Sequence, residues 1–360
     1  MLARLCAFCV CLIGGVIASG AVSSPLVAEQ SAAAASAPDV RKLGPQVGDK
    51  LPAFSLRDQT GRARTLESLM GPKGLMLTFS RSASWCPYCK TQLVEMQGRL
   101  ADVRQNGYEL AVITYDPVPV LAEFAARRQI TFPLLSDAGS AVIKRYGLLN
   151  TAVDPSNNLF GYPFPGMFIV DRRGVVTSRF FEDGYQERNT MSSVLVRMGS
   201  KVNVPATKVS SPNVEITSYT TDQAAAPGTH FSIVLDITPA PRVHVYAPGV
   251  TGYKPIVLTV KAKPGLVVRA AQYPKSEDYH FKPLDEHVQV YQKPFRIVQD
   301  VMIDSSAAGQ AALKGATSVT IEGILNYQAC DDKVCFNPQT VPLTWTVSLK
   351  ALDRERAPGQ

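Results

Sequence analysis

The sequence predicts two domains of different class, an α/β domain followed by an all-β sandwich. In the first half of the chain, buried-strand runs such as "GLMLTF" (residues 74–79) and "YELAVITYD" (108–116) alternate with helical patterns, which is typical of α/β layers. Beyond residue 213 the helical pattern stops, and short apolar strands recur between turns rich in proline and glycine, which indicates a β-sandwich. These strands are "FSIVLDI", "PIVLTV", "FRIVQDVMI", "SVTIEGILNY" and "VPLTWTVSL".

Two linkers set the predicted domain boundaries. Residues 22–45, rich in Ala, Ser and Pro, lack the periodic apolar residues of a core, so we expect a flexible segment. Residues 201–213 form the second predicted linker. The α/β domain therefore covers residues 46–200, the sandwich covers residues 214–350, and residues 351–360 are expected to be a tail.

The composition is that of an ordinary globular protein. The chain has 360 residues, 46% of them apolar and 19% charged, which is enough for two packed cores. Its 37 Lys and Arg against 30 Asp and Glu give a net charge of +7, but no basic run is interleaved with aromatic residues. Nucleic acid is therefore not an expected partner, and no cofactor is expected.

The N-terminus has the three parts of a secretory signal. Residues 1–4 are positively charged, residues 5–18 are apolar but too short to span a bilayer comfortably, and the small residues 18–21 suit signal peptidase. We expect residues 1–21 to be a cleaved signal peptide and the mature protein to be periplasmic; an uncleaved membrane anchor is the alternative. Cleavage removes three of the seven cysteines and leaves an even number, which fits disulfides in an exported protein.

The stretch "SASWCPYCK" (residues 82–90) places Cys86 and Cys89 two residues apart, directly after Trp85. Such a pair binds a metal, closes a structural disulfide or performs redox chemistry. Here a buried strand precedes the pair and an amphipathic helix follows it, an order that favours redox chemistry. The expected buried face of that helix consists of Leu93, Met96, Leu100 and Val103.

The positions of the two cysteines on this helix predict different roles. A cysteine in the first turn lies where free N–H groups and the helix dipole stabilise an anion, so its thiolate forms below the ordinary pKa of about 8.5. Cys86 is therefore expected to be the attacking thiolate, and Cys89, one turn further on, to resolve the mixed disulfide. All four histidines lie in the second domain, so any activation of Cys86 has to come from the helix end and its neighbours.

Residues 46–198 resemble the thioredoxin-like redoxins of the peroxiredoxin and thiol-reductase group, the AhpC/TSA type. "VGDKLPAFSLRDQTGR" is similar to their entry hairpin, "TFSRSASWCPYCK" to their active-site turn, and "YPFPGMFIVDRRGVV" to the segment that carries their cis-proline. The resemblance implies a thioredoxin-like fold with a cis Pro165 beside the cysteine pair. Pro163 is the competing assignment, and two ordinary trans prolines are the other alternative.

Two departures from this family bear on the chemistry. Peroxidase members have Pro and then Thr or Ser before the attacking cysteine, at the positions where this chain has Phe79 and Ala83, which weakens the expectation of peroxide reduction. Many thioredoxins also have a buried acid below the active site, and here that position falls near Thr78. The peroxidase residues and the buried acid therefore have no counterpart at these positions of this chain.

The second cysteine pair, Cys330 and Cys335, lies in "LNYQACDDKVCFNPQT" (residues 325–340). A disulfide that closes so short a loop removes little entropy from the unfolded chain, worth about 2 kcal/mol against about 4.7 kcal/mol for a 100-residue loop. A disulfide between these two cysteines would therefore stabilise the fold little, and the pair is better suited to reversible reduction and oxidation.

This segment and the strand pattern of residues 214–349 resemble the periplasmic N-terminal domain of the disulfide reductase DsbD. The specific part is "YQACDDKVC", although the DsbD domain spaces its cysteines one residue wider. The resemblance implies an immunoglobulin-like sandwich whose cysteine pair passes electrons to thioredoxin-like partners. It also implies a mobile cap, for which residues 277–291 are the best candidate, with Phe281 or Tyr279 as the covering ring; a plain surface loop is the alternative.

The sequence thus predicts an exported thiol-disulfide oxidoreductase whose partners are protein thiols and disulfides, including a membrane disulfide reductase, with electron exchange between its own two domains. Two alternatives stay open: a thiol peroxidase that uses Cys86, and a binding module in which both pairs are inert structural disulfides. A zinc site made of all four cysteines is not expected, because about 240 residues separate the pairs. The oligomeric state is not predicted.

The signal peptide leads to the first testable prediction. Mature protein from the envelope fraction of its native host should begin between residues 20 and 38, because signal peptidase removes the apolar stretch. Intact-mass analysis measures this directly. Full-length protein that keeps Met1 and stays in the cytoplasm would contradict the predicted export.

Overall fold

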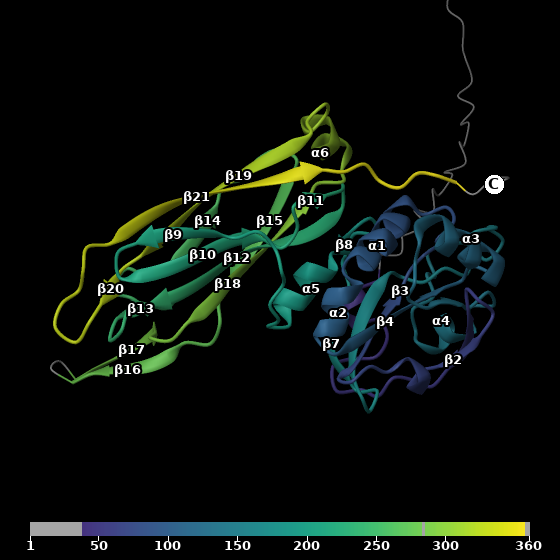
Figure 1. Ribbon diagram of the computed structural model, residues 1–360, viewed down its shortest axis with the longest axis horizontal. Helices are drawn as coiled ribbons and strands as arrows, with labels where there is room; N and C mark the ends of the chain where they lie inside the picture. Colours follow the sequence, from purple (N-terminus) through teal and green to yellow (C-terminus); the bar gives the residue numbers. More distant parts are fainter. Residues whose placement is uncertain (1–37, 283–284, 357–360) are drawn as a thin grey trace, which may run out of the picture. The chain divides into compact units, whose positions relative to one another are not determined.

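The computed structural model describes residues 38–282 and 285–356 of the chain (Figure 1). The predicted signal peptide and most of the first predicted linker lie outside the described residues. Within the described part, an α/β domain is followed by strand-rich structure, so the predicted fold class is confirmed. No helix among these residues is both long and apolar enough to cross a membrane.

The α/β domain is built on a seven-stranded mixed sheet in the order β2-β1-β5-β4-β3-β6-β7. The central strand β3 pairs in parallel with β4 and antiparallel with β6, so the segments that follow β3 and β4 lie at the same edge of the sheet. The strands are β1 (Ser55–Asp58), β2 (Ala63–Thr65), β3 (Gly74–Phe79), β4 (Tyr108–Thr114), β5 (Leu134–Ser136), β6 (Gly166–Asp171) and β7 (Val176–Phe180). The helices are η1 (Val40–Lys42), η2 (Glu67–Leu69), α1 (Pro87–Gly98), α2 (Leu100–Gln105), α3 (Val118–Arg128), α4 (Ala141–Arg145) and α5 (Met191–Arg197).

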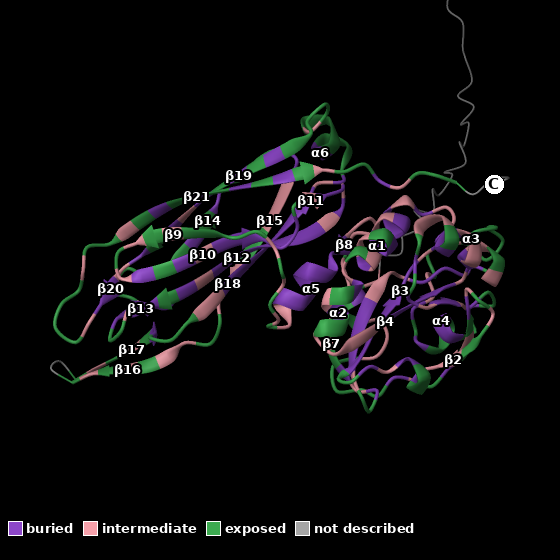
Figure 2. Ribbon diagram, in the orientation of Figure 1, coloured by how far each residue is buried: buried purple, intermediate pink, exposed green. Residues whose placement is uncertain are grey.

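Both faces of this sheet are covered, and every residue of β3 is buried (Figure 2). Met76 belongs to an apolar cluster that includes side chains of α1, α2, α3 and α5, whereas Leu75 and Leu77 belong to a second cluster with α4. This is the period-two alternation of a strand that is buried on both faces. It explains why the sequence of β3 is continuously apolar.

The helical face expected after the first cysteine pair is confirmed, although two helices share it. A break at Arg99 divides the segment, so that α1 ends at Gly98 and α2 begins at Leu100. The predicted residues all lie buried in the first cluster: Leu93, Met96, Leu100 and Val103.

The sandwich domain consists of three sheets around a common apolar core. One has the order β15-β18-β12-β10-β9, with β8 (Arg188–Asn189) paired to β12; the others are β11-β21-β19-β14 and β16-β17-β13-β20. Alternate residues of β19 and β21 are buried, which is the pattern of strands with one face in water (Figure 2). The strands are β9 (Thr207–Ser211), β10 (Val214–Thr220), β11 (Ala224–Ala225), β12 (Thr229–Pro239), β13 (His244–Tyr246), β14 (Val257–Val260), β15 (Leu266–Gln272), β16 (Glu277–Phe281), β17 (Glu286–Tyr291), β18 (Phe295–Ile303), β19 (Ser318–Tyr327), β20 (Ala329–Cys330) and β21 (Gln339–Leu349).

Two predictions about local structure are wrong in part. Residues 207–211 of the predicted linker form strand β9, which pairs antiparallel with β10. Asn213 adopts a positive φ of 65° in the turn between them, so Ser210, Ser211 and Pro212 belong to a hairpin. The sandwich domain also contains one short helix, α6 (Ala307–Ala312), which begins where the Ser306 side chain accepts a hydrogen bond from the Gly309 N–H.

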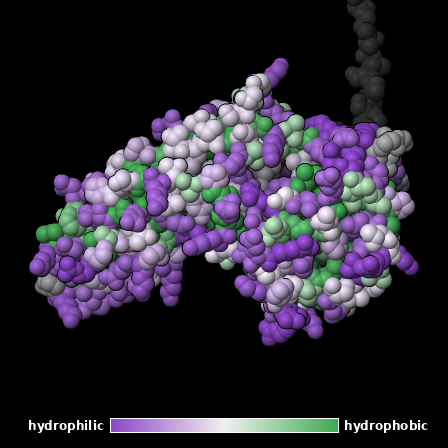
Figure 3. Space-filling view, viewed as in Figure 1, coloured by the Kyte–Doolittle hydropathy of each residue, from purple (hydrophilic) through white to green (hydrophobic). Residues whose placement is uncertain are grey.

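Large apolar side chains reach the surface of the described residues one at a time, and hydrophilic and hydrophobic residues are interspersed on the face that Figure 3 shows. Scattered exposure of this kind is normal for a globular protein. The surface alone therefore does not indicate where this protein acts.

Candidate redox-active site

The first cysteine pair lies at the start of α1 and forms a disulfide. Cys86 is the residue that caps the helix, and its sulfur accepts a hydrogen bond from the backbone N–H of Cys89 at 3.2 Å. Pro87 occupies the first helical position, where its missing N–H costs nothing. The sequence-based expectation that Cys86 lies at the helix N-terminus agrees with this geometry. The N–H group that now faces the disulfide stabilises a thiolate once the bond is reduced.

A buried carboxylate fixes the loop that delivers Cys86 from β3 to α1. Asp116, which follows β4, accepts hydrogen bonds from the Ser82 hydroxyl at 2.8 Å and from the Ala83 N–H at 2.7 Å. Burial raises the pKa of Asp116, and these two bonds oppose the shift. Sequence analysis did not single out Asp116, although the final Asp of "YELAVITYD" directly after a buried strand was a usable signal.

An arginine from far along the chain contacts the other cysteine. The Arg188 guanidinium donates from Nη2 to the Cys89 sulfur at 3.2 Å and is buried. Burial lowers the pKa of Arg188 to about 9. A positive charge this close stabilises the thiolate of Cys89 after reduction and so lowers the pKa of that thiol. Sequence analysis missed Arg188, since 99 residues separate it from Cys89 and no motif surrounds it.

Trp85 forms one wall of the site. Its indole Nε1 donates to the Tyr115 hydroxyl at 2.8 Å, and its ring lies edge-on to Tyr162 with centroids 5.2 Å apart. The Arg81 guanidinium lies over the rings of Trp85 and Tyr162, 4.7 Å from each centroid. These contacts give Trp85 and Arg81 fixed positions beside the cysteines.

The expected cis-proline is not observed. The described residues contain no cis peptide bond, so Pro165 and Pro163 are both trans. The Phe164 N–H donates to Leu148 O at 2.7 Å and the chain enters β6 at Gly166. The trans isomer is the lower-energy form of a bond to proline. Pro165 still lies near the site, because it lines a cavity of about 20 Å³ together with Arg188.

The first disulfide is covered in this structure. Cys86 is 1% exposed and Cys89 is 0% exposed. Both pack in one apolar cluster with Tyr88 of α1, with Ala226 from the sandwich domain and with Leu352 from the segment that follows the last strand. An attacking thiol therefore has no open path to this pair until part of the cover moves.

The second cysteine pair is also a disulfide, but its two sulfurs differ in exposure. Cys330, at the end of β20, is buried, whereas Cys335 is exposed and follows Val334, which is 53% exposed. The Tyr246 hydroxyl donates to the Cys330 sulfur at 3.1 Å and lies 3.5 Å from that of Cys335. An incoming thiolate can therefore reach Cys335, with Cys330 as the leaving group that Tyr246 stabilises.

The predicted cap, residues 277–291, contains the hairpin of β16 and β17, and β17 joins the sheet that carries Cys330. Of the two candidate rings, Tyr279 belongs to the apolar cluster around Cys330, whereas Phe281 does not. The Tyr279 hydroxyl donates to the Asp332 carboxylate at 3.0 Å, which links the hairpin to the loop between the cysteines. Tyr279 is therefore the ring that contacts this site.

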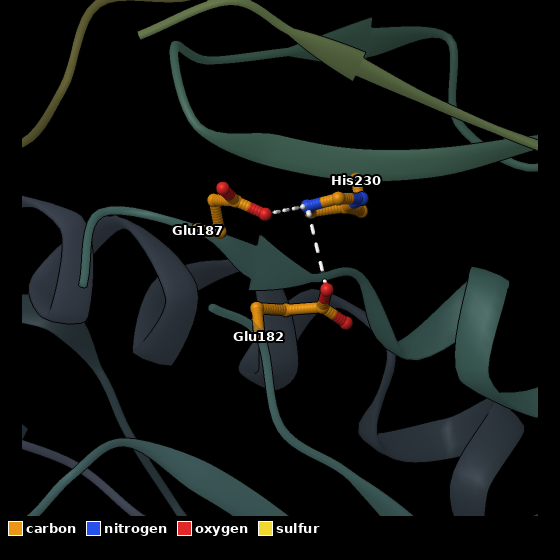
Figure 4. A group of neighbouring side chains, drawn as sticks. All are labelled: Glu182, Glu187 and His230. Carbon is orange, nitrogen blue, oxygen red and sulfur yellow. Dashed lines mark hydrogen bonds and ion pairs between the residues drawn. The ribbon is translucent and has the colours of Figure 1, made fainter. Parts of the chain in front are cut away.

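A cluster of charged side chains joins residues 182–187 to the sandwich domain (Figure 4). His230 lies 2.9 Å from Glu187 through Nε2 and 2.9 Å from Asp300 through Nδ1. Burial opposes the charged imidazole, but these two carboxylates prevail and raise the pKa of His230 to about 9. The Arg269 guanidinium already binds Glu187 at 2.9 Å. We interpret the cluster as a network of ion pairs, since cations occupy the carboxylates that a metal would need.

These observations define the class of the protein. It has a thioredoxin-like domain with a disulfide at a helix N-terminus, followed by a β-sandwich with a second, partly exposed disulfide. Residues 47–179 match the family model "AhpC/TSA family", and residues 217–344 match "Thiol:disulfide interchange protein DsbD, N-terminal". The chain belongs to the AhpC/TSA family through its first domain and carries a DsbD N-terminal domain as its second, which confirms the fusion predicted from the sequence.

Named relatives fall into two functional groups. Over 138 residues the chain is 32% identical to "Alkyl hydroperoxide reductase E" of Mycobacterium tuberculosis, which covers 38% of this chain and 84% of that protein. Over 136 residues it is 30% identical to "Thiol-disulfide oxidoreductase ResA" of Geobacillus thermodenitrificans, which covers 38% of this chain and 69% of that protein. A similar solved structure is that of peroxidoxin BcpB from Mycobacterium tuberculosis, with 26% identity and a TM-score of 0.36, covering 39% of this chain and 89% of that one. The two sequence relatives support a redox enzyme.

The contact between Arg188 and Cys89 leads to a prediction about acidity. In a Cys86→Ser background, Arg188→Gln should raise the pKa of the Cys89 thiol by about 1 to 3, because the nearby positive charge is lost. The ultraviolet absorbance of the thiolate as a function of pH measures this value without a reagent having to enter the covered site. Arg197→Gln, which removes a guanidinium that binds Asn189 instead, is the matched control. An unchanged pKa would show that Arg188 has only a structural role.

Proposed function

We propose that this protein is an exported thiol-disulfide oxidoreductase that exchanges disulfides with protein thiols through Cys86 and Cys89. The observation that carries the proposal is that each of the two sulfurs accepts a hydrogen bond from a different group that can stabilise a thiolate. Cys86 accepts the helix N–H of Cys89, and Cys89 accepts the guanidinium of Arg188. A structural disulfide needs neither group, whereas thiol exchange needs the thiolate of each residue in turn.

In the reducing direction, the Cys86 thiolate attacks one sulfur of a client disulfide. A bond forms between Cys86 and that sulfur, and the other client sulfur leaves as a thiolate. Cys89, deprotonated under the influence of Arg188, then attacks the Cys86 sulfur and releases the second client thiolate. Two electrons pass to the client and the Cys86–Cys89 disulfide is restored; the oxidising direction is the reverse sequence.

The second pair is proposed as the entry point for a redox partner. A thioredoxin-like protein, such as a domain of a membrane disulfide reductase, would attack the exposed Cys335 and displace the Cys330 thiolate. The Tyr246 hydroxyl, 3.1 Å from the Cys330 sulfur, is in place to donate to that thiolate. The exposed neighbour Val334 offers an apolar contact for the partner beside the sulfur.

Electron exchange between the two pairs of one chain would need the domains to separate. The two disulfides lie near opposite ends of β19. Ala225, which precedes the Ala226 that covers the first pair, is paired with Leu349 of β21, and this part of β21 pairs with the Ser318 end of β19. The second pair follows the other end of β19, at Tyr327. The nine residue steps along β19 correspond to about 30 Å. We therefore propose that an internal relay, where it operates, follows release of the α/β domain from the sandwich.

Peroxide reduction is the second candidate function, since the alkyl hydroperoxide reductase relative favours it. The residues around Cys86 favour disulfide exchange instead, because Phe79 and Ala83 are both buried and bring no hydroxyl to the sulfur. Stopped-flow mixing of the reduced protein with hydrogen peroxide separates the two candidates. Rapid oxidation of Cys86 would favour the peroxidase.

Trapping tests the main proposal. Cys89→Ala should accumulate mixed disulfides between Cys86 and client proteins, because the resolving thiol is absent. Cys86→Ala should accumulate few or none. Non-reducing electrophoresis followed by mass spectrometry of the linked peptides measures both. A chain that traps clients through Cys89 and not through Cys86 would reverse the assigned roles, and one that traps through neither would refute the function.

The second pair leads to a separate prediction. With a reduced thioredoxin-like protein lacking its resolving cysteine, wild-type protein should form a mixed disulfide at Cys335, the exposed sulfur. Tyr246→Phe should slow this reaction about 5- to 10-fold, as expected from losing a hydrogen bond worth about 1 to 1.4 kcal/mol to the leaving thiolate. Tyr327→Phe, which removes a hydroxyl that bonds Pro212 O instead, is the matched control. Linkage at Cys330 would contradict the assignment.

A further inference from the structure

The last segment of the described chain crosses the first cysteine pair. After β21 the Lys350 N–H donates to Ala225 O at 2.9 Å, and the chain then runs to residue 356 without helix or strand. We call residues 350–356 the C-terminal strap. Its Leu352 is 9% exposed and packs in the apolar cluster that contains Cys86 and Cys89.

Asp353 anchors the strap to the α/β domain through backbone and side chain together. Its N–H donates to the Thr91 hydroxyl of α1 at 2.8 Å. Its carboxylate accepts two hydrogen bonds from Arg128 of α3, at 2.8 Å from Nε and 2.9 Å from Nη2. A bidentate pair of this kind is directional as well as attractive.

Glu355 provides a second anchor on the same two helices. Its backbone oxygen accepts a hydrogen bond from Lys90 Nζ, and its carboxylate accepts one from Arg128 and lies 3.4 Å from Arg127. Lys90 is 1% exposed, and burial lowers its pKa while Asp353 opposes the shift. All three cations belong to the α/β domain, whereas both acids belong to the strap.

We propose that the strap occupies the client-binding site of the Cys86–Cys89 pair and mimics the clients that this site selects. The site takes an extended polypeptide with an apolar residue over the sulfurs, an acidic residue directly after it and a second acidic residue two positions further on. Leu352, Asp353 and Glu355 supply that pattern here. This inference rests on the proposed function, because it concerns how a client reaches Cys86.

The groove is larger than the strap requires. A cavity of about 670 Å³ remains between α1 and the strap, lined by Tyr88, Thr91 and Glu95 on one side and by residues 350–355 on the other. An extended segment with larger side chains than Ala351 therefore fits the same path. Because the strap is tethered, its effective concentration is in the millimolar range, so it protects the disulfide until it opens.

The test measures how fast dithiothreitol reduces each disulfide of the full chain. Two thiols of the reagent supply two electrons and two protons, so Cys86–Cys89 becomes two thiols and the reagent closes to its cyclic disulfide. In Asp353→Asn with Glu355→Gln, reduction of Cys86–Cys89 should become about tenfold faster, equivalent to about 1.4 kcal/mol lost from the closed state. Quenched alkylation and mass spectrometry follow both pairs, and Cys330–Cys335 is the internal reference whose rate should not change.

Two further variants separate loss of the strap from a change in charge. Leu352→Ser leaves the charge of the strap unchanged and should accelerate reduction in the same way. If the acid-to-amide variant were faster only because uncovered cations attract the reagent thiolate, Leu352→Ser would have no effect. Glu322→Gln removes an exposed acid that binds Lys261 on the sandwich and should have no effect. Acceleration of both disulfides together would indicate general unfolding and would overturn the proposal, as would an unchanged rate in both strap variants.

A peptide tests the selected pattern. The hexapeptide of residues 351–356, added to the Asp353→Asn, Glu355→Gln protein, should restore protection of Cys86–Cys89, and the same peptide with both acids replaced by amides should not. Equal protection by the two peptides would refute acidic selection. Client trapping through Cys86 is measured independently, so a protein that traps clients but shows no strap effect refutes only this inference, and the opposite result refutes only the function.

Discussion

The pairing of β8 with β12 is the interaction on which the first redox site depends. The Arg188 N–H donates to Gly228 O at 2.8 Å and the Thr190 N–H donates to His230 O at 3.0 Å, so a short segment of the α/β domain becomes part of a sandwich sheet. Gly228 has a φ of +78°, and a Cβ there would lie 2.4 Å from Gln186 O, so only glycine fits. The sandwich thereby holds the guanidinium that contacts Cys89.

The ion pairs of His230 reinforce the same junction and make it sensitive to pH. The pKa of His230 is raised from 6.5 to about 9 in the folded protein, since its bonds to Asp300 and Glu187 outweigh burial. The stability that this charge contributes is therefore complete below pH 6.5 and is lost as pH rises through about 9. At neutral pH the junction carries most of this stabilisation.

The buried positive charge of Arg188 also affects the redox state of the Cys86–Cys89 pair. Among the described residues no carboxylate accepts a hydrogen bond from its guanidinium, whose polar partners are backbone oxygens and the Cys89 sulfur. A buried cation without a hydrogen-bonded anion is costly. Reduction of the disulfide allows Cys89 to become that anion, so the environment of Arg188 favours the reduced, thiolate form over the disulfide.

The sequence was sufficient for features encoded by neighbours in the chain. The continuous apolar run of β3, the strand "SVTIEGILNY" that forms β19 and the position of Cys86 before a helix each depend on residues within a few positions, and each was predicted. The contacts of Arg188 with Cys89 and of Asp353 with Thr91 join residues 99 and 262 positions apart, and no local pattern carries such information. The trans Pro165 was mispredicted for a related reason, since a resemblance between sequences does not specify which isomer the surrounding chain stabilises.

The two disulfides of this chain therefore differ in how they are controlled. Cys335 is exposed, and the group that assists its partner, Tyr246, is already in place, so its reactivity is set by local chemistry. Cys86 also has an activating group, the N-terminus of α1, but it is only 1% exposed. Its reactivity is therefore set by the fraction of molecules in which the covering residues are displaced. We therefore expect a redox partner that meets the closed protein to react with the second pair first. In the proposed function, access to the first pair is a separate step, which a client drives by binding there more favourably than the segment that covers the pair.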